Sequence, residues 1–133
     1  MDIDSSRAPE RRGQGQTINL LDKIRRIEGH WQPRVVAEMN DYQFKVVKLL
    51  GDFIWHTHHD TDETFIVLEG TLRIDLRDGA IELQAGEMGV VPKGVEHKPY
   101  AQAEVKLLLI EPRGVVNTGE AENERTVAND IWI

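Results

Sequence analysis

Three histidines and one glutamate in this sequence have the residue types and the spacing to hold a metal ion. His56 and His58 are two residues apart, and side chains with that spacing on a strand point to the same side. Glu63 follows across a polar turn, so its carboxylate can return to the same centre. A Pro-x-Gly turn at 92–94 leads to His97, which offers a third imidazole. A six-coordinate ion held by these groups would keep two positions for water, substrate or dioxygen.

The same histidines could instead be structural. A barrel with structural histidines would bind no metal, and a chelator would not lower its thermal stability. His59 points to the opposite side from His58, and His30 lies in a turn before the sheet, so both are expected to be exposed. Asp60 and Asp62 are expected to form a turn, because the alternating oxygen donors and the central glycine of a calcium loop are missing.

The elements that must position these groups are strands. Runs of β-favouring residues at 35–39 and 42–50 flank Asn40-Asp41, a pair that tolerates the left-handed backbone of a tight hairpin. Apolar and polar residues alternate on both sides of Asp78-Gly79, over 72–76 and 81–84, which predicts a second hairpin. Further short strands are expected at 52–58, 64–69, 87–91, 97–100 and 105–110. Roughly nine closely spaced strands predict an all-β fold, either a barrel or a double-sheet jelly roll.

Shorter segments flank these strands. Apolar residues at helical spacing predict a short helix over 19–27, with Asn19 as its N-cap and Gly29 as its stop. The segment near 124–133 is expected to form one or two helical turns and to cover a sheet edge or a partner subunit. Residues 1–16 are polar and charged, which predicts a disordered tail ahead of a single domain over 17–133.

Composition excludes several classes of protein. A chain of 133 residues suits one domain. Its 16 basic and 23 acidic residues give a formal net charge of -7, which disfavours nucleic acid and anionic membranes as partners. The absence of cysteine leaves imidazole and carboxylate as the metal ligands. No apolar run approaches the roughly twenty residues of a membrane span, and residues 1–15 do not resemble a secretory signal, so we expect a cytoplasmic protein.

The two histidine-containing stretches resemble the two motifs of the cupin superfamily. The matching residues are Gly51, His56, His58, Glu63 and Gly70 in the first motif and Gly86, Pro92, Gly94 and His97 in the second. Two positions differ, because Gly51 is one residue closer to the first histidine than usual and Ala101 replaces a frequent asparagine. The resemblance covers about residues 34–112 and is to a small, single-domain bacterial cupin. It implies a double-stranded β-helix (jelly-roll) barrel, a metal held by the three histidines and the glutamate, and commonly a homodimer.

Strand parity identifies candidate residues around the metal. The side chains expected to face inward with the ligands are those of Ile54, Phe65 and Val67, which predicts an apolar pocket for a small ring or hydrocarbon-bearing substrate. Lys45 and Lys48 lie on opposite sides of one strand, so at most one of them reaches the interior. Candidates whose roles the pattern leaves open are Glu96, Lys98, Tyr100 and Glu111.

These observations support three hypotheses about function. The first is a metal-dependent enzyme that acts on a small organic molecule, by dioxygenase or isomerase chemistry. It would use one divalent transition metal per chain (Mn, Fe, Ni, Zn or Cu), with Glu63 as a proton acceptor. The second is a non-catalytic protein that binds a small molecule through the metal, and the third is a barrel with structural histidines. The vacant positions of the metal shell favour the enzyme.

Overall fold

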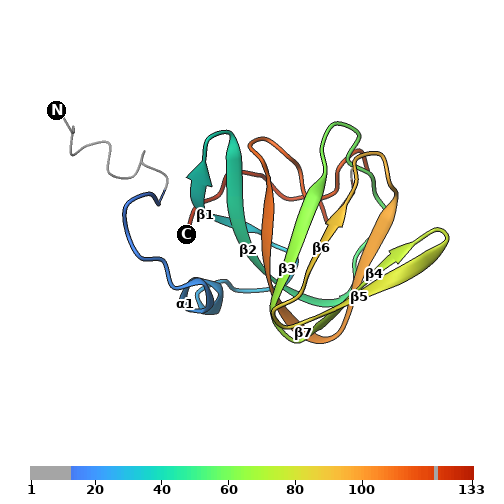
Figure 1. Ribbon diagram of the computed structural model, residues 1–133, viewed down its shortest axis with the longest axis horizontal. Helices are drawn as coiled ribbons and strands as arrows, with labels where there is room; N and C mark the ends of the chain where they lie inside the picture. The colour runs from blue at the N-terminus through green and yellow to red at the C-terminus, as the bar shows by residue number, and fades with distance from the viewer. Residues whose placement is uncertain (1–12, 122) are drawn as a thin grey trace.

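Strands dominate this protein. The computed structural model describes residues 13–121 and 123–133, so most of the predicted disordered tail, residues 1–12, lies outside the described residues. Within the described residues there are one helix and seven strands (Figure 1). They are α1 (Leu20–Arg25), β1 (Arg34–Met39), β2 (Tyr42–Asp52), β3 (Glu63–Glu69), β4 (Thr71–Leu76), β5 (Gly79–Gln84), β6 (Met88–Val91) and β7 (His97–Pro112). The predicted all-β jelly roll is confirmed.

The long strand β7 joins the two parts of the barrel. It pairs with β2 along most of its length, with β3 through its second half and with β4 through its first residues, always antiparallel. The sheet order is β1-β2-β7-β3-β6, with β4 and β5 branching from β7. The strands predicted at 97–100 and 105–110 are therefore one strand, because β2 offers backbone partners to both halves. Residues 53–58 form only an isolated bridge at His56, and these two differences reduce nine predicted strands to seven.

Both predicted hairpins are present. β1 and β2 are connected through Asn40, whose φ of 55° is the left-handed conformation that asparagine tolerates. In the β4–β5 hairpin Leu76 pairs with Gly79. The turn residues there are Arg77 and Asp78, one position earlier than the Asp78-Gly79 pair predicted.

Apolar residues form a core on each side of the main sheet. The larger core fills the barrel, and its buried members include Val47, Phe65 and Leu107. The smaller core lies on the outer face, where Ile24 of α1 and Ile27 pack against β2 and β7. Asn19 caps α1 as predicted, since its side chain accepts a hydrogen bond from the Asp22 amide at 3.0 Å. The helix is shorter than the predicted 19–27, and no helix in the described part of the chain is long and apolar enough to cross a membrane.

No helix forms in the described part of the C-terminal segment, where residues 123–126 make a turn and residues 131–133 extend along β1, so the helical turns predicted near 124–133 are wrong. The Val35 amide donates to the Ile131 carbonyl at 2.7 Å, and the Ile133 amide donates to the Val35 carbonyl at 3.1 Å. These bonds make a parallel bridge between Val35 and Trp132. The physical reason is that β1 is an edge strand, whose free backbone groups are satisfied by an extended segment and not by a helix. The predicted covering of a sheet edge is confirmed.

Candidate metal centre

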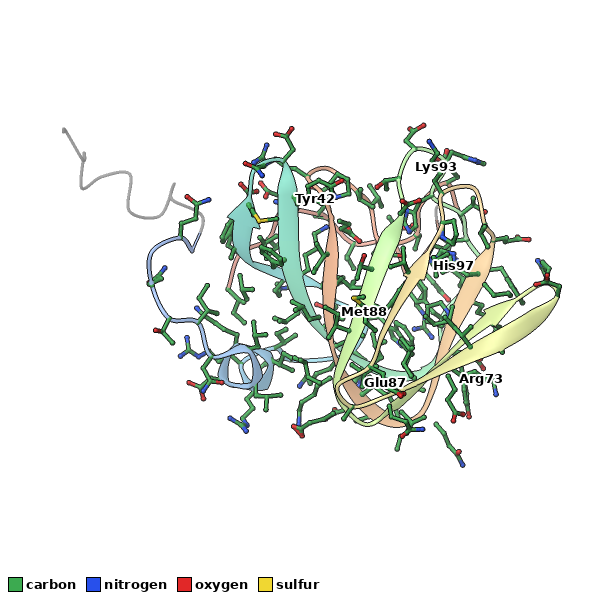
Figure 2. All side chains as sticks on the ribbon, in the orientation of Figure 1. Tyr42, Arg73, Glu87, Met88, Lys93 and His97 are labelled. Carbon is green, nitrogen blue, oxygen red and sulfur yellow. The ribbon has the colours of Figure 1, made fainter. Side chains whose placement is uncertain are left out.

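The four predicted ligands come from three separate segments and converge inside the barrel. His56 and His97 face each other across a short antiparallel bridge, with backbone hydrogen bonds of 3.0 Å in both directions. Glu63 is the first residue of β3. His97, labelled in Figure 2, is the first residue of β7. His58 lies in the loop between β2 and β3. The prediction that His56 and His58 lie on one regular strand is therefore wrong. The loop nevertheless brings their rings within 5.1 Å, centroid to centroid.

The ligand atoms of these four residues lie close enough together to bind one ion. One nitrogen or oxygen from each residue lies within 4.8 Å of all the others, and all four side chains are buried. The Glu63 Oε1 atom is 3.2 Å from His97 Nε2 and 3.4 Å from His58 Nε2. The four residues therefore present their polar atoms to a common point.

Backbone carbonyls set the protonation of two of the imidazoles. His56 Nδ1 lies 2.9 Å from the Ile54 carbonyl, and His97 Nδ1 lies 2.9 Å from the Val95 carbonyl. Because a carbonyl only accepts, each Nδ1 carries the proton, which leaves the Nε2 lone pair directed at the centre. Burial, helped by the nearby His97, lowers the pKa of His56 to about 4, so this ring is neutral at neutral pH.

The third imidazole has an unsatisfied atom. The Nε2 atom of His58 is buried and has no hydrogen-bond partner in the structure. A buried polar atom without a partner is costly and uncommon in a folded protein. A metal ion at the common point would satisfy His58 together with the other two imidazoles and the carboxylate, so the residues present fit a first-row divalent ion.

The two buried carboxyl groups near the centre differ in their ionisation. Burial opposes the ionisation of Glu63, but the His58 and His97 rings, whose Nε2 atoms lie 3.4 Å and 3.2 Å from Glu63 Oε1, outweigh it and hold its pKa well below the usual value. At Glu111 burial and the negative charge of Glu63 act together and raise the pKa well above the usual value. Glu63 is therefore the carboxylate that is available as a ligand.

Backbone contacts hold the ligand loop from two sides. The Gly94 amide donates to the His58 carbonyl, and the Lys93 amide donates to Asp62 Oδ1, each at 2.8 Å. Asp62 thus joins the Pro-x-Gly turn to the loop that carries His58, a more specific role than the turn former predicted. On the other side the Glu120 amide donates to the Thr57 carbonyl at 3.0 Å. The loop is fixed by both the second motif and the C-terminal segment.

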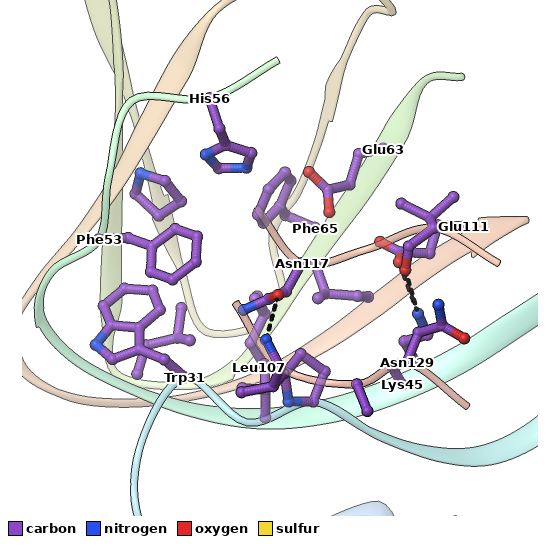
Figure 3. A pocket seen from close by; sticks show the side chains of 18 of the residues that line it. Trp31, Lys45, Phe53, His56, Glu63, Phe65, Leu107, Glu111, Asn117 and Asn129 are labelled. Atoms are coloured by element: carbon purple, nitrogen blue, oxygen red, sulfur yellow. Dashed lines mark hydrogen bonds and ion pairs between the residues drawn. The ribbon is translucent and has the colours of Figure 1, made fainter. Parts of the chain in front are cut away.

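A cavity that is partly open to solvent adjoins the centre on the side of His56 and Glu63 (Figure 3). Phe65 lines this cavity, whereas the other two predicted pocket residues, Ile54 and Val67, are not part of the lining. Val67 is fully buried in the barrel core, and Ile54 is partly buried against it. The rest of the lining includes a buried ion pair, an aromatic stack and part of the C-terminal segment.

The ion pair joins two of the residues whose roles the sequence leaves open. Lys45 Nζ lies 2.8 Å from Glu111 Oε2, and both residues line the cavity. Lys48 is only half-buried and is not part of the lining, so of the two lysines only Lys45 reaches the cavity, which agrees with the prediction that at most one would do so.

The other open candidates make contacts outside the cavity. Glu96 accepts a hydrogen bond from Arg77 at 2.7 Å, and the Arg73 guanidinium lies 4.3 Å from the centre of the Tyr100 ring. Lys98 pairs with Asp52 and Asp75.

Sequence reasoning missed much of the cavity wall. Trp31 and Phe53 stack with their ring centroids 4.7 Å apart and line the cavity. Strand parity over residues 52–58 selects Ile54 and not Phe53, but β2 ends at Asp52 and parity does not hold beyond it. Asn117 and residues 127–130 of the C-terminal segment also line the cavity, and nothing in the local sequence indicates this.

Known proteins with similar sequences and structures share this fold and show the family of the chain. Residues 46–111 match the Cupin domain. A cupin-2 domain containing protein from Shewanella frigidimarina is 64% identical, and the similarity covers 72% of this chain and 94% of that protein with a TM-score of 0.71. The protein YdbB of Bacillus subtilis (strain 168) is 36% identical over 77 residues, which are 57% of this chain and 68% of YdbB.

A more distant structure shares the fold alone. Hydroquinone 1,2-dioxygenase PnpCD, solved with Cd2+ and 4-hydroxybenzonitrile, is 18% identical, with 72% of each chain covered and a TM-score of 0.62. The high identity to the Shewanella protein over nearly all of its length is decisive for the family. This chain belongs to the cupin family.

Proposed function

We propose that this protein is a metal-dependent enzyme that acts on a small organic molecule, by dioxygenase or isomerase chemistry. The observation that carries the proposal is the buried group of three histidines and one glutamate, which adjoins a cavity through His56 and Glu63. A structural cluster would satisfy its polar atoms internally, whereas His58 Nε2 is left without a partner. A cavity next to a set of converging ligands is the usual arrangement of a metalloenzyme site.

The roles of the residues follow from their positions. His56, His58, Glu63 and His97 would hold one divalent transition metal (Mn, Fe, Ni, Zn or Cu), which would supply Lewis-acid or redox chemistry. Glu63 is also the proposed catalytic residue, because its buried carboxylate borders the cavity, where it could accept a proton from a bound substrate. Phe65 and the Trp31–Phe53 stack give the site apolar walls that exclude water.

Elemental analysis tests the metal requirement. Protein without an affinity tag, purified without chelator, is compared with the variant His97→Ala. We expect about one equivalent of a first-row metal in the native protein and its loss in the variant. If neither protein contains metal, even after reconstitution with Mn, Fe, Ni, Zn or Cu, the enzymatic proposal is wrong.

Oxygen dependence then separates the two reaction types. Substrate screening is run in air and under strict anaerobiosis with the metal found by analysis. A dioxygenase consumes oxygen and stops without it, whereas an isomerase that moves protons next to a carbonyl continues. Tight binding without turnover in either condition would favour the alternative, a non-catalytic metal-dependent binding protein.

A further inference from the structure

A buried ion pair lies beside the cavity, away from the proposed metal ligands in the sequence. Lys45 Nζ, on β2, donates to Glu111 Oε2, on β7, at 2.8 Å, and the two side chains are only 4% and 3% exposed. Lys45 Nζ also donates to the Val115 carbonyl at 3.2 Å. Both charged residues line the cavity that adjoins the metal centre.

Stability alone does not account for this pair. Removing charged groups from water is costly, and apolar residues of similar volume are often as stabilising as a buried ion pair. The neighbouring inward-facing residues of the same strand, Val47 and Leu49, are apolar. A lysine and a glutamate at this position therefore indicate a polar role in the cavity.

The ammonium group of Lys45 has an unused proton. A lysine ammonium carries three donors, and two of them bind Glu111 and Val115. The third has no partner among the residues that the structure describes, and a molecule in the cavity would lie within its reach. Figure 3 shows Lys45 and Glu111 on one side of the cavity and the stacked Trp31 and Phe53 on the other.

Charge in the cavity favours an anion once a metal is bound. Among the buried ionisable residues of the lining, Lys45 is positive, Glu63 is negative and His56 is neutral, while burial and the neighbouring Glu63 disfavour the charged form of Glu111. A divalent ion therefore makes the net charge of the lining positive. Asp130 also lies in the lining, but it is exposed and accepts a hydrogen bond from Gln43 at 2.7 Å.

We infer that the cavity binds a small, flat organic acid, whose carboxylate accepts a hydrogen bond from Lys45 while its hydrocarbon body lies against the Trp31–Phe53 stack. The inference rests on the proposed metal-dependent function and names the substrate class of that site. One free ammonium proton beside a carboxylate suits a singly charged carboxylate better than a phosphate, which needs several donors at once.

The test measures binding of two probes that differ mainly in charge. Calorimetric titration compares 3-hydroxybenzoate with 3-hydroxybenzamide in zinc-loaded protein, with zinc content measured for every sample. We expect the native protein to prefer the acid, and Lys45→Met to lose about tenfold in affinity for the acid with little change for the amide. Lys48→Met, on the opposite side of the same strand, is the matched control and keeps the preference.

A second variant keeps the test informative if Lys45→Met does not fold. Lys45→Gln is uncharged but can still donate a hydrogen bond to Glu111, so it should lose the preference for the acid without leaving Glu111 unpaired. If Lys45 served only to pair with Glu111, this variant would keep the native ratio of acid to amide affinity. If zinc binds and neither variant changes the ratio of acid to amide affinity, the inference is wrong while the proposed function stands. If zinc does not bind the native protein, the proposed function fails and the inference falls with it.

Discussion

At the level of the single residue, the unpartnered Nε2 of His58 separates a metal site from a structural histidine cluster. We expect His58→Ala to lower metal affinity by about 100-fold or more, because it removes one of four ligands. The variant would also lose the stabilisation that the metal provides, about 2.7 kcal/mol when the metal is at roughly 100 times its dissociation constant. Thermal unfolding with and without metal measures both effects.

The adjacent residue is the control for that prediction. His59 is exposed, so His59→Ala should keep native metal affinity and the native shift in melting temperature. If His58→Ala retained the full metal-dependent shift, His58 would not be a ligand, and its buried ring would have to be explained as packing.

At the level of the element, the C-terminal segment holds the ligand loop through Gly119. Its φ is 57°, and a Cβ atom there would lie 2.1 Å from the carbonyl oxygen of Thr57, between His56 and His58. We therefore expect Gly119→Ala to cost about 1–3 kcal/mol of stability and to lower metal affinity, since the loop must move away. Denaturant unfolding and metal titration measure these two quantities.

Gly114 provides a matched comparison for this glycine. Its φ of 92° is also in the left-handed region, but a Cβ atom there would meet nothing within 4 Å. Gly114→Ala should therefore lose only the stability that a left-handed backbone costs an alanine, and it should leave metal affinity unchanged. Equal losses of metal affinity in the two variants would contradict a role for the Gly119 contact.

At the level of the whole molecule, the two edges of the main sheet differ in their cover. β1 is bridged by the C-terminal segment, whereas β6 ends the sheet with Met88 61% and Val90 49% exposed (Figure 2). An exposed apolar edge strand favours association, and we predict a homodimer that buries this edge. Sedimentation should give a dimer for the native protein and a monomer for Met88→Lys/Val90→Lys.

A substitution at the covered edge is the control for association. Met39 on β1 is 51% exposed, and Met39→Lys should remain dimeric. A monomeric native protein would rule out the homodimer. A dimer that survives the double substitution in β6 would place its interface elsewhere, with the outer core around α1 as the next surface to test.

The sequence by itself determined the fold class, both hairpins and the four residues of the candidate metal centre. These depend on the alternation of apolar and polar residues, on the residues of the turns and on the short spacings within each histidine-containing motif. His56, His58 and Glu63 lie within eight residues of one another, so even an incorrect strand assignment kept them together. Only the tertiary structure decided the cavity. Lys45 and Glu111 are 66 residues apart, and Trp31 meets Phe53 only once the barrel has closed. Contacts of this kind depend on how β7 bridges the sheet and on where the C-terminal segment finds unpaired backbone groups, and no local pattern encodes either.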